Sequence, residues 1–431
     1  MQLTGRGLVA VFLVMLFAVS PASAQDSNII VQCPDATAEH PNIKCVHLVA
    51  GDGMATMADD MEDPDFGGAG KKQYIFSFAE VPLPQDAVYT EGPDAGNPVP
   101  LSDYPGWVME TGMLAANAPA PTISVDEDDE LFLSLTNVGM AMRPDLFDPH
   151  TVHWHGFPEA SAVFDGVPDS SVSINMGATL TYYYNVKDAG TYMYHCHVEA
   201  TEHMQMGMLG NLFVRPRQNK LPAQSLNGFA HIPWDESTGT GNRYAYNDGD
   251  GTTAYDVEFP IQMGSFDPDF HDASLNVQPL PFSGMRDRYF LLNGRGYPDT
   301  VNTSVISTTD PLGTEQPSQP IDSLVTATPG QKVLLRISNL NITEFYTLGS
   351  NLPMQVVALD ARLLRDGAGG NMYYTTNSLT LGGGQSADVI IDTAGLAIGS
   401  TYFLYSTNLD RLANDAENFG GMMTEIRVVA P

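Results

Sequence analysis

Two short segments of the chain hold six histidines, one cysteine and one methionine whose types and spacing could bind a metal. Imidazole nitrogens, a thiolate and a thioether sulfur are ligands that proteins offer to copper. The first segment contains His150, His153 and His155, and the second contains His195, Cys196, His197, His203 and Met208. These residues therefore indicate a copper-binding region.

The second segment is expected to form a strand, a loop and a return strand. Residues 191–194 are rich in β-formers, and residues 209–214 form another apolar β-type run. Because successive side chains of a strand point to opposite faces, His195 and His197 share one face and Cys196 points to the other. One short segment can thus serve two sites that lie back to back.

The first segment shows the same alternation. His153 and His155 share strand parity, and His150 has the opposite parity. We therefore expect two separate ligand sets. The first set is His150, Cys196, His203 and Met208, and the second set is His153, His155, His195 and His197.

The two sets differ in the copper chemistry that they suit. Two imidazoles, one thiolate and one thioether are the ligands of a blue-copper electron-transfer site, in which a long axial methionine tunes the reduction potential. Four imidazoles without sulfur suit copper in a harder site with open positions. The alternative for the second set is an inherited site that holds no metal.

The motifs HTVHWHG and YHCHVEATEHMQMGM resemble the copper signatures of the multicopper oxidase (laccase-like) family over about residues 121–214. The resemblance implies copper as cofactor, the first set as type 1 copper ligands, and the second set as half of the oxygen-reducing trinuclear cluster. Six residues separate Cys196 from His203, where the family usually has four. Related copper nitrite reductases carry an aspartate where His153 stands, so this sequence resembles the oxidases more than those reductases.

Residues 1–24 predict a secretory signal. Arg6 is the only charged residue, residues 8–19 are apolar, and Ala22-Ser23-Ala24 fits a cleavage site. The apolar run is shorter than the roughly 20 residues of a membrane span. We expect an exported protein, periplasmic or secreted, without a membrane span after signal removal; retention of the signal as an anchor is the alternative.

The three cysteines divide into a pair and a single residue. Cys33 and Cys45 follow the signal closely, and an exported protein meets conditions that permit disulfides. We expect a Cys33–Cys45 disulfide. Cys196 is then left free, as a metal thiolate must be.

The chain is strongly acidic, with 19 Lys and Arg against 51 Asp and Glu, a formal charge of −32. Nucleic acid is disfavoured as a partner, because phosphate binding requires a basic face. An acidic surface attracts metal cations or a basic redox partner. Solubility alone is an equally good explanation of the charge.

Short strands with turn signals between them predict an all-β fold. Residues 74–81, 122–137, 179–186 and 191–197 read as strands, which is typical of a β-sandwich. The resemblance implies two tandem cupredoxin-like Greek-key sandwiches. The expected divisions are the signal at residues 1–24, an irregular acidic extension at 25–70, a copper-binding domain at 71–218, and a linker with the second domain at 219–431.

An internal repeat supports the second domain and shows what it lacks. Residues 325–339 match 123–137, and Gly421-Met422 matches Gly207-Met208. In this alignment Thr343, Tyr346 and Leu348 stand opposite His150, His153 and His155, and Ser406-Thr407-Asn408 stand opposite His195-Cys196-His197. The family takes four histidines from each of two domains for its cluster, and this chain supplies four.

The remaining four histidines lie outside both sets. We expect His40 and His47 on the surface, and His231 and His271 in structural roles within loops. His271 is the most plausible ligand from the second half.

Two functional hypotheses follow. The first is a copper-dependent oxidoreductase that takes electrons from a small molecule or a metal ion through a solvent-facing His203 and passes them to the second set, with O2 as acceptor. Its second site is either mononuclear or completed by another subunit. The other hypothesis is a blue-copper electron carrier or copper-binding protein without catalytic activity, whose partner is a cytochrome. A homo-oligomer such as a trimer is expected by analogy with the family alone.

Overall fold

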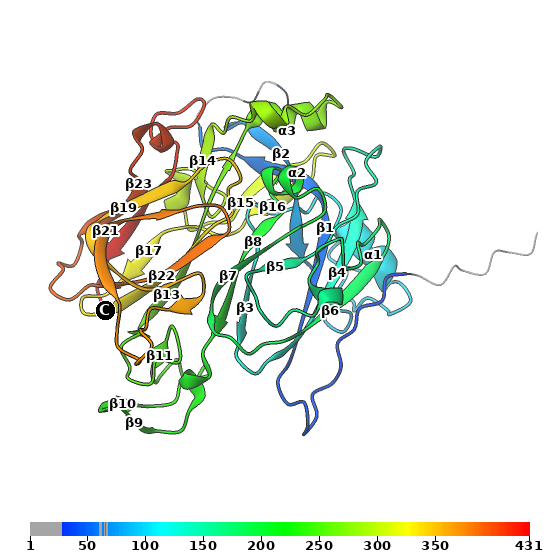
Figure 1. Cartoon of the computed structure of the whole chain (residues 1–431). Helices are drawn as coiled ribbons and strands as arrows, with labels where there is room; N and C mark the ends of the chain where they lie inside the picture. The colour runs from blue at the N-terminus through cyan, green and yellow to red at the C-terminus, as the bar shows by residue number, and fades with distance from the viewer. Residues whose placement is uncertain (1–27, 60–62, 64, 66–67) are drawn as a thin grey trace, which may run out of the picture.

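The computed structural model describes residues 28–59, 63, 65 and 68–431. The predicted signal at residues 1–24 lies outside the described residues. Two β-rich halves stand side by side in Figure 1, the first coloured blue to green and the second mostly yellow to red. In the described part of the chain, no helix has the length and apolar character needed to cross a membrane.

The first half is a sandwich of two four-stranded sheets. The first sheet has the order β2-β1-β4-β6, with β2 at Lys72–Glu80, β1 at Ile43–Thr56, β4 at Glu130–Gly139 and β6 at Thr179–Asn185. The second sheet has the order β3-β8-β7-β5, with β3 at Ala120–Asp126, β8 at Leu209–Arg215, β7 at Gly190–His195 and β5 at His153–His155.

The core of the first half lies between these two sheets. Leu131, Leu133 and Leu135 alternate along β4 and are fully buried, as are Leu212 and Val214 on β8. This two-residue period is the one that places every second side chain on the inner face of a sheet. The same period sorts the histidines and the cysteine at the end of β7.

Strand β1 corrects the expectation of an irregular extension over residues 25–70. It runs parallel to β4 and antiparallel to β2. Its second part is rich in Gly, Ala and Asp, which have low strand propensity and make the strand hard to predict from the sequence. The buried Asp52 carboxylate accepts hydrogen bonds from the backbone N–H groups of Ala141 and Met142 and from the Tyr74 hydroxyl.

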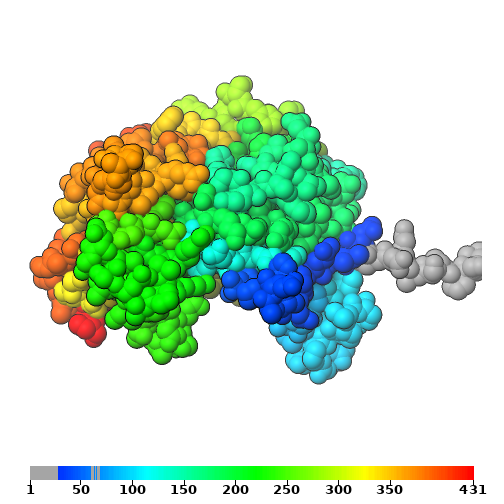
Figure 2. Space-filling view, turned by 60° about the horizontal axis from the view of Figure 1, so that its bottom comes forward, coloured from blue at the N-terminus to red at the C-terminus, as the bar shows by residue number. Residues whose placement is uncertain are grey.

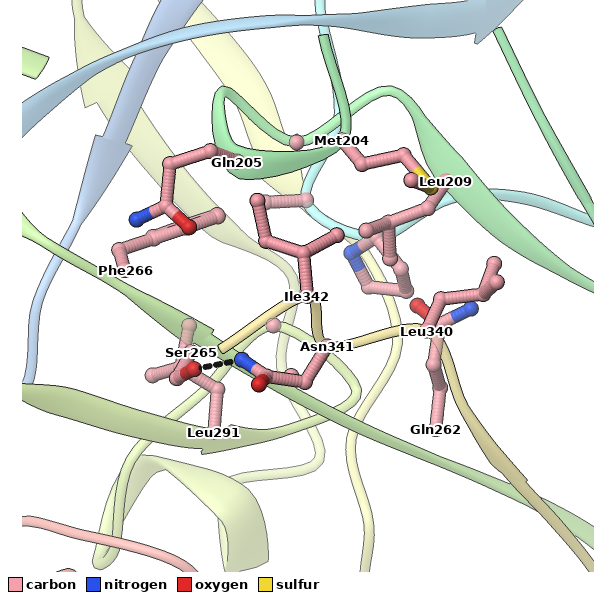
Figure 3. Close-up of a pocket in the computed structure, with 15 residues that line it drawn as sticks. Met204, Gln205, Leu209, Gln262, Ser265, Phe266, Leu291, Leu340, Asn341 and Ile342 are labelled. Atoms are coloured by element: carbon pink, nitrogen blue, oxygen red, sulfur yellow. Dashed lines mark hydrogen bonds between the residues drawn. The ribbon is translucent and has the colours of Figure 1, made fainter. Parts of the chain in front are cut away.

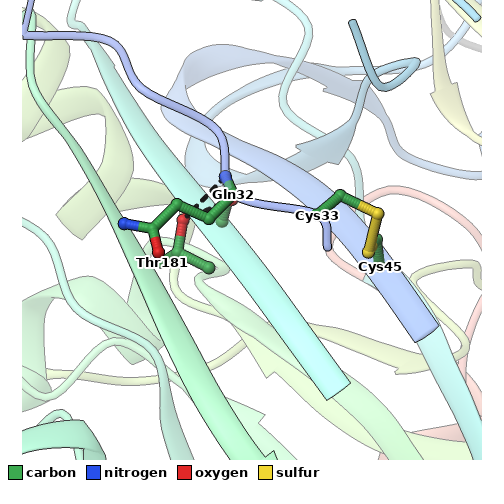
Figure 4. Close-up of a disulfide and its surroundings, with 5 residues drawn as sticks. Gln32, Cys33, Cys45 and Thr181 are labelled. Atoms are coloured by element: carbon green, nitrogen blue, oxygen red, sulfur yellow. Dashed lines mark hydrogen bonds between the residues drawn. A yellow bond between two sulfur atoms is a disulfide. The ribbon is translucent and has the colours of Figure 1, made fainter. Parts of the chain in front are cut away.

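The segment before β1 is attached to it by a disulfide between Cys33 and Cys45 (Figure 4). The backbone N–H of Gln32 also donates to the Thr181 hydroxyl on β6. In the space-filling view of Figure 2 this dark blue segment lies against the first half. The extension before β1 is therefore part of the first half.

The second half is one continuous ten-stranded sheet. The long strand β19 pairs with β22 and with β23, and so joins two layers that are separate sheets in the first half. Its strands are β13 at Val257–Phe266, β14 at Tyr289–Leu292, β17 at Val325–Ala327, β18 at Lys332–Asn339, β19 at Tyr346–Leu359, β20 at Arg362–Leu363, β21 at Tyr374–Leu381, β22 at Gln385–Asp392, β23 at Thr401–Ser406 and β24 at Met423–Val428.

Among the described residues, three short α-helices, five 3-10 helices and three small hairpins complete the fold. The α-helices are α1 at Tyr104–Thr111, α2 at Ala200–Gln205 and α3 at Pro268–Leu275. The hairpins pair β9 at Gln224–Leu226 with β10 at Phe229–His231, β11 at Arg243–Tyr244 with β12 at Ala254–Tyr255, and β15 at Ile306–Thr309 with β16 at Glu315–Gln319.

The strand pairings of the first half recur in the second. The parallel pair β1–β4 corresponds to β13–β18, and the antiparallel pair β4–β6 corresponds to β18–β22. The parallel pair β3–β8 corresponds to β17–β24, and the antiparallel pair β7–β8 corresponds to β23–β24. The predicted internal repeat is therefore present in the fold.

Buried charges hold the two halves together. The Arg336 guanidinium on β18 is fully buried and lies 2.7 Å from Glu258 and 3.2 Å from Asp388. It also donates to the hydroxyl of Thr191 on β7, and Arg215 on β8 pairs with Glu258 at 2.9 Å. Because both β7 and β8 belong to the first half, this network fixes one half against the other.

Candidate metal centre

The thiol of Cys196 lies just beyond the end of β7, in the buried interior of the first half. Its sulfur is 3.2 Å from Nδ1 of His203 and 3.9 Å from Nδ1 of His150. The three donor atoms lie within 4.8 Å of one another, and all three residues are fully buried. Met208 is also buried, and its backbone carbonyl accepts the N–H of Cys196.

The electrostatics of this first set favour the thiolate. Burial raises the pKa of Cys196, but His203 and His150 outweigh burial and hold that pKa well below its usual range. The thiolate is the form of cysteine that binds metals. One thiolate and two converging δ nitrogens, with the buried Met208 hydrogen-bonded through its backbone to Cys196, fit copper.

His203 corrects the expectation of a solvent-facing ligand. Its side chain is 0% exposed, and its ring packs against the ring of Phe76 on β2 at a centroid distance of 5.9 Å. The segment between Cys196 and His203 forms the start of helix α2, which turns the imidazole inward. The carboxylate of Asp148 lies 3.8 Å from Nε2 of His203. An electron donor would therefore have to approach this first set across other residues.

The second set lies on the opposite face of the same segment. Strands β5 and β7 pair with His153 directly opposite His195, and the metal-binding atoms of His153, His155 and His195 fit within 4.8 Å of one another. Nδ1 of His155 is 3.3 Å from Nε2 of His195. His197 is not in this group of three, but its ring centroid lies 5.1 Å from that of His153.

We call His153, His155, His195 and His197 the quartet. Backbone carbonyls orient two of its four rings. Nδ1 of His153 donates to the carbonyl of Asp165 at 2.6 Å, and Nδ1 of His195 donates to the carbonyl of Cys196 at 2.8 Å. Each Nε2 is then left with its lone pair for a metal, which is the usual arrangement of histidine ligands. Burial lowers the pKa of His195 to about 3 and also lowers that of His153, so both imidazoles are neutral at pH 7. Sequence reasoning missed Asp165, because it acts here through a backbone carbonyl.

The quartet opens into a pocket of about 520 Å³ that is closed on its other side by the second half. The opposite wall consists of the loop after β18, residues 340–345, and of Gly383 and Gly384. Among the described residues, the second half contributes no histidine to this pocket. The four imidazoles of the first half are therefore the nitrogen ligands available there.

A smaller cavity lies behind this wall, between the two halves (Figure 3). It shares Met204, Leu340, Asn341 and Ile342 with the quartet pocket. Its volume is about 20 Å³. The buried side chains of Gln205 and Gln262 line it, and Oε1 of Gln205 and Nε2 of Gln262 have no hydrogen-bond partner among the described residues. This mostly apolar cavity has room for about one water molecule, beside these two amide groups.

Backbone hydrogen bonds identify the counterparts of the first set in the second half. The backbone N–H of Cys196 donates to the carbonyl of Met208, whose own N–H donates to the carbonyl of His203. In the same way the backbone N–H of Ser406 donates to the carbonyl of Met422, whose N–H donates to the carbonyl of Arg411. His150 faces Ile174 as Tyr346 faces Leu381. Tyr346, Ser406, Arg411 and Met422 therefore occupy the places of His150, Cys196, His203 and Met208.

The quartet has counterparts as well. Gly349 pairs with Tyr405 on β19 and β23 as His153 pairs with His195 on β5 and β7. Gly349, Asn351, Tyr405 and Thr407 thus occupy the places of His153, His155, His195 and His197.

These pairings correct the alignment of the two halves made from sequence. That alignment places Thr343 opposite His150 and Thr407 opposite Cys196, three residues and one residue away from the structural counterparts. The cause is loop length, because 13 positions separate Asn137 from His150 but only 7 separate the equivalent Asn339 from Tyr346. The conclusion that the second half lacks these metal ligands is unchanged.

The other histidines have structural surroundings. His47, expected on the surface, is buried and contacts the hydroxyls of Tyr104 and Thr136, because β1 is a core strand. His40 is exposed and pairs with Glu130.

In the second half, His231 is buried on β10 and contacts the hydroxyl of Tyr244 and the carbonyl of Leu221. His271 lies on α3, not in a loop, and its ring nitrogens contact the carbonyls of Tyr74 and Gln205. Both nitrogens of His271 are therefore engaged away from the quartet.

Comparisons with known proteins agree with this geometry. Residues 106–219 match the family model described as multicopper oxidase. Multicopper oxidase MCE of Talaromyces pinophilus is 33% identical over 115 residues, which cover 26% of this chain and 18% of that protein. Laccase-1 of Emericella nidulans is 36% identical over 109 residues, which cover 24% of this chain and 16% of that protein. The match thus spans less than a fifth of the length of these relatives.

Solved structures extend the likeness of fold to most of the chain. The blue copper oxidase from Nitrosomonas europaea has a TM-score of 0.57 at 18% identity, covering 90% of this chain and 86% of that chain. The multicopper oxidase mgLAC has a TM-score of 0.56 at 17% identity, with the same coverage. The fold is therefore that of the cupredoxin-like multicopper oxidases. Residues 106–219 therefore resemble the multicopper oxidases, a family whose cofactor is copper.

Proposed function

We propose that the protein is a copper-dependent oxidoreductase in which type 1 copper accepts electrons and a second copper, held by the histidine quartet, receives them. The observation that carries this proposal is the back-to-back arrangement of the two ligand sets on one segment. The Cys196 thiol faces His150 and His203, while its backbone carbonyl accepts the N–H of His195 in the quartet. One residue is thus in contact with both sets.

The residues of the chain have distinct tasks in this proposal. Bound copper would supply one-electron chemistry at both sets. The complete burial of His150, Cys196 and His203 excludes water from the first set. Covalent adjacency of Cys196 to His195 and His197 provides a path only a few bonds long. The carbonyl of Asp165 holds His153 in the tautomer that binds a metal.

The finer parts of the function rest on the sequence. We propose a small molecule or a metal ion as electron donor, O2 as acceptor, and a basic redox partner as a further possibility suited to the acidic surface. The predicted signal supports export to the periplasm or the exterior. We propose a homo-oligomer such as a trimer by analogy with the family alone.

Copper content and spin-resonance spectra test the central proposal. The copper-loaded protein is expected to contain at least two coppers per chain, one with a thiolate-type signal and one without. A single copper per chain with only the thiolate-type signal would contradict it.

The second candidate is a blue-copper electron carrier or copper-binding protein. The observation that favours it is the lack of histidines from the second half in the quartet pocket of the described chain. Oxygen uptake separates the two candidates. Uptake with a phenolic or metal-ion donor favours the oxidoreductase, and its absence with every donor favours the carrier.

A further inference from the structure

Another large cavity is formed by three segments that are distant in the sequence. Its volume is about 430 Å³, and it is lined by residues 89–91, by residues of α1 and the segment after it, and by the turn of the β15–β16 hairpin. None of the lining residues belongs to either ligand set. We call it the α1 cavity. Pockets that bind small organic molecules are roughly 300–1,000 Å³ in volume, so the α1 cavity has the size of an organic-ligand site.

Contacts between the two halves hold the walls of the α1 cavity in place. The side chain of Asn117, in the first half, donates to the carbonyl of Pro317 on β16. At the turn of the hairpin, the Asp310 carboxylate accepts the backbone N–H groups of Leu312 and Thr314. The cavity is therefore formed by the protein alone, as ligand sites usually are.

Aromatic and apolar side chains form part of the lining. Trp107 on α1 is only 7% exposed, and its ring packs against the ring of Tyr104 at a centroid distance of 5.6 Å. The Trp107 indole N–H donates to none of the described residues. Leu312 and Met113 also line the cavity and are 73% and 40% exposed. Exposed apolar groups beside a fixed aromatic ring favour a ligand with an organic body.

The charged groups of the lining are all acidic. Glu91, Glu110, Asp310 and Glu315 line the cavity, and no Lys, Arg or His of the described chain does so. None of these four carboxylates forms an ion pair with a described residue. Carboxylates without cationic partners in a cleft attract positive charge. A cation is therefore the charge type that the cavity favours.

We propose that the α1 cavity binds a small organic cation of the ammonium class. The charged group lies against Trp107 and near the carboxylates of Glu110 and Glu315, and the apolar part lies toward Leu312. Ring faces attract ammonium groups, and the carboxylates add to this attraction. A metal ion would use the carboxylate oxygens alone and would gain nothing from the ring and the apolar side chains. This binding activity is separate from the proposed copper chemistry.

Calorimetric titration with choline tests the site in the copper-loaded full chain. Salt at about 0.15 M screens attraction to the acidic surface in general. We expect one choline per chain. The neutral compound 3,3-dimethylbutan-1-ol has the shape of choline without its charge and should bind about tenfold more weakly. No choline binding, or equal binding of both compounds, would overturn the proposal.

Two double variants with the same change of charge locate the site. Glu110→Gln with Glu315→Gln removes two exposed carboxylates of the cavity and should weaken choline binding about tenfold. Glu39→Gln with Glu236→Gln is the matched control, because both residues are exposed and neither lines the cavity. The control should leave binding unchanged. Equal binding by the two double variants would show an effect of overall charge only and would overturn the proposal.

A tryptophan variant and a metal competitor test the aromatic contact. Trp107→Phe keeps a buried aromatic ring and should weaken choline binding about threefold, because tryptophan is the best partner of a cation. Trp234→Phe is the control and should have no effect, since the Trp234 ring already has Arg243 over it at 4.4 Å. Magnesium at the same concentration as choline should not displace it. Displacement by magnesium, or unchanged binding in Trp107→Phe, would overturn the proposal.

These measurements do not depend on copper content or colour. If choline does not bind while both coppers are present, this inference alone fails. If choline binds and only one copper is present, the proposed function fails and the ammonium site stands.

Discussion

The two halves of the molecule have the same strand pairings, but the positions equivalent to His150, Cys196 and His203 hold side chains of different chemistry. In the first half a thiol and two imidazole nitrogens converge there within 4.8 Å. In the second half Tyr346, Ser406 and Arg411 occupy these places. The Tyr346 hydroxyl donates to Ser265 at 2.7 Å, and the Arg411 guanidinium lies 4.5 Å from the centre of the Phe290 ring and pairs with Glu344.

This difference separates the requirements of the fold from those of the metal site. The second half builds the same pairings with its polar groups satisfied by the protein itself. The first half buries donors whose lone pairs point at one another, which is costly unless a cation or a proton lies between them. In our proposal, copper binding depends on a few side chains of the first half, because the second half builds the same strand pairings without them.

Cys196→Ser should have the largest effect, because it gives the first half the residue that the second half has at the equivalent position, Ser406. We expect complete loss of the blue absorption of the copper-loaded protein, since the colour requires a copper–thiolate bond. Ser406→Ala is the control and should leave the spectrum unchanged. An optical spectrum of each variant checks both expectations.

His203→Ala should separate the two ligand sets of the first half. We expect loss of the blue absorption with retention of copper at the quartet, because His203 contacts only the thiol side. Copper analysis with spin resonance measures both sites in one sample. Equal loss of both coppers would show that the two sets are not independent.

The charged network between the halves should carry a large part of their mutual stability. Glu258→Gln leaves the fully buried Arg336 with one carboxylate fewer, and losing one partner of a buried ion pair costs about 3–5 kcal/mol. Asp128→Asn is the control, because its pair with Lys187 is solvent-exposed and contributes about 0–1 kcal/mol. Denaturant unfolding of the two variants should show this contrast. Equal effects would contradict the assigned role of the network.

The same network predicts a pH dependence. Burial raises the pKa of Glu258, but Arg336 and Arg215 outweigh it and lower that pKa to about 2, against about 4.3 in an unfolded chain. A lowered pKa gives stability that is fully present above about pH 4.3 and is lost as the pH falls toward 2. The stability difference between wild type and Glu258→Gln should therefore shrink over this range. A difference that stays constant would refute the assignment.

Arg411→Ala gives the smallest expected effect and tests the second half alone. Removing the pair with the partly exposed Glu344 and the contact with Phe290 should lower the free energy of unfolding by about 1 kcal/mol. Copper content should not change, in contrast to His203→Ala at the equivalent position. Loss of copper in Arg411→Ala would show that the second half supports the metal sites in a way that its contacts do not reveal.

The sequence predicts the division of the ligands because strand alternation is a local rule. It places His195 and His197 on one face of the segment and Cys196 on the other without any knowledge of the fold. The family resemblance and the repeat likewise predict the two sandwiches. The strand β1 escapes prediction because Gly51, Asp52 and Gly53 have low strand propensity and depend on pairing with β2 and β4.

Other features depend on contacts between distant segments. His203 is buried because it lies on helix α2. The six residues between Cys196 and His203 do not indicate whether the His203 side chain points inward or toward solvent. The counterparts in the second half are fixed by hydrogen bonds across loops of unequal length. The pocket needs Phe345 and Gly384 from the second half beside His155 from the first, a proximity that no local pattern encodes.

Anomalous scattering at the copper edge from crystals of the copper-loaded protein tests the central claim most directly. We predict one peak within bonding distance of Sγ of Cys196 and of Nδ1 of His150 and His203, and a separate peak at Nε2 of His153 and His195. A protein that binds copper with no peak at the Cys196 sulfur, or with one peak shared by both faces of the segment, would contradict the account.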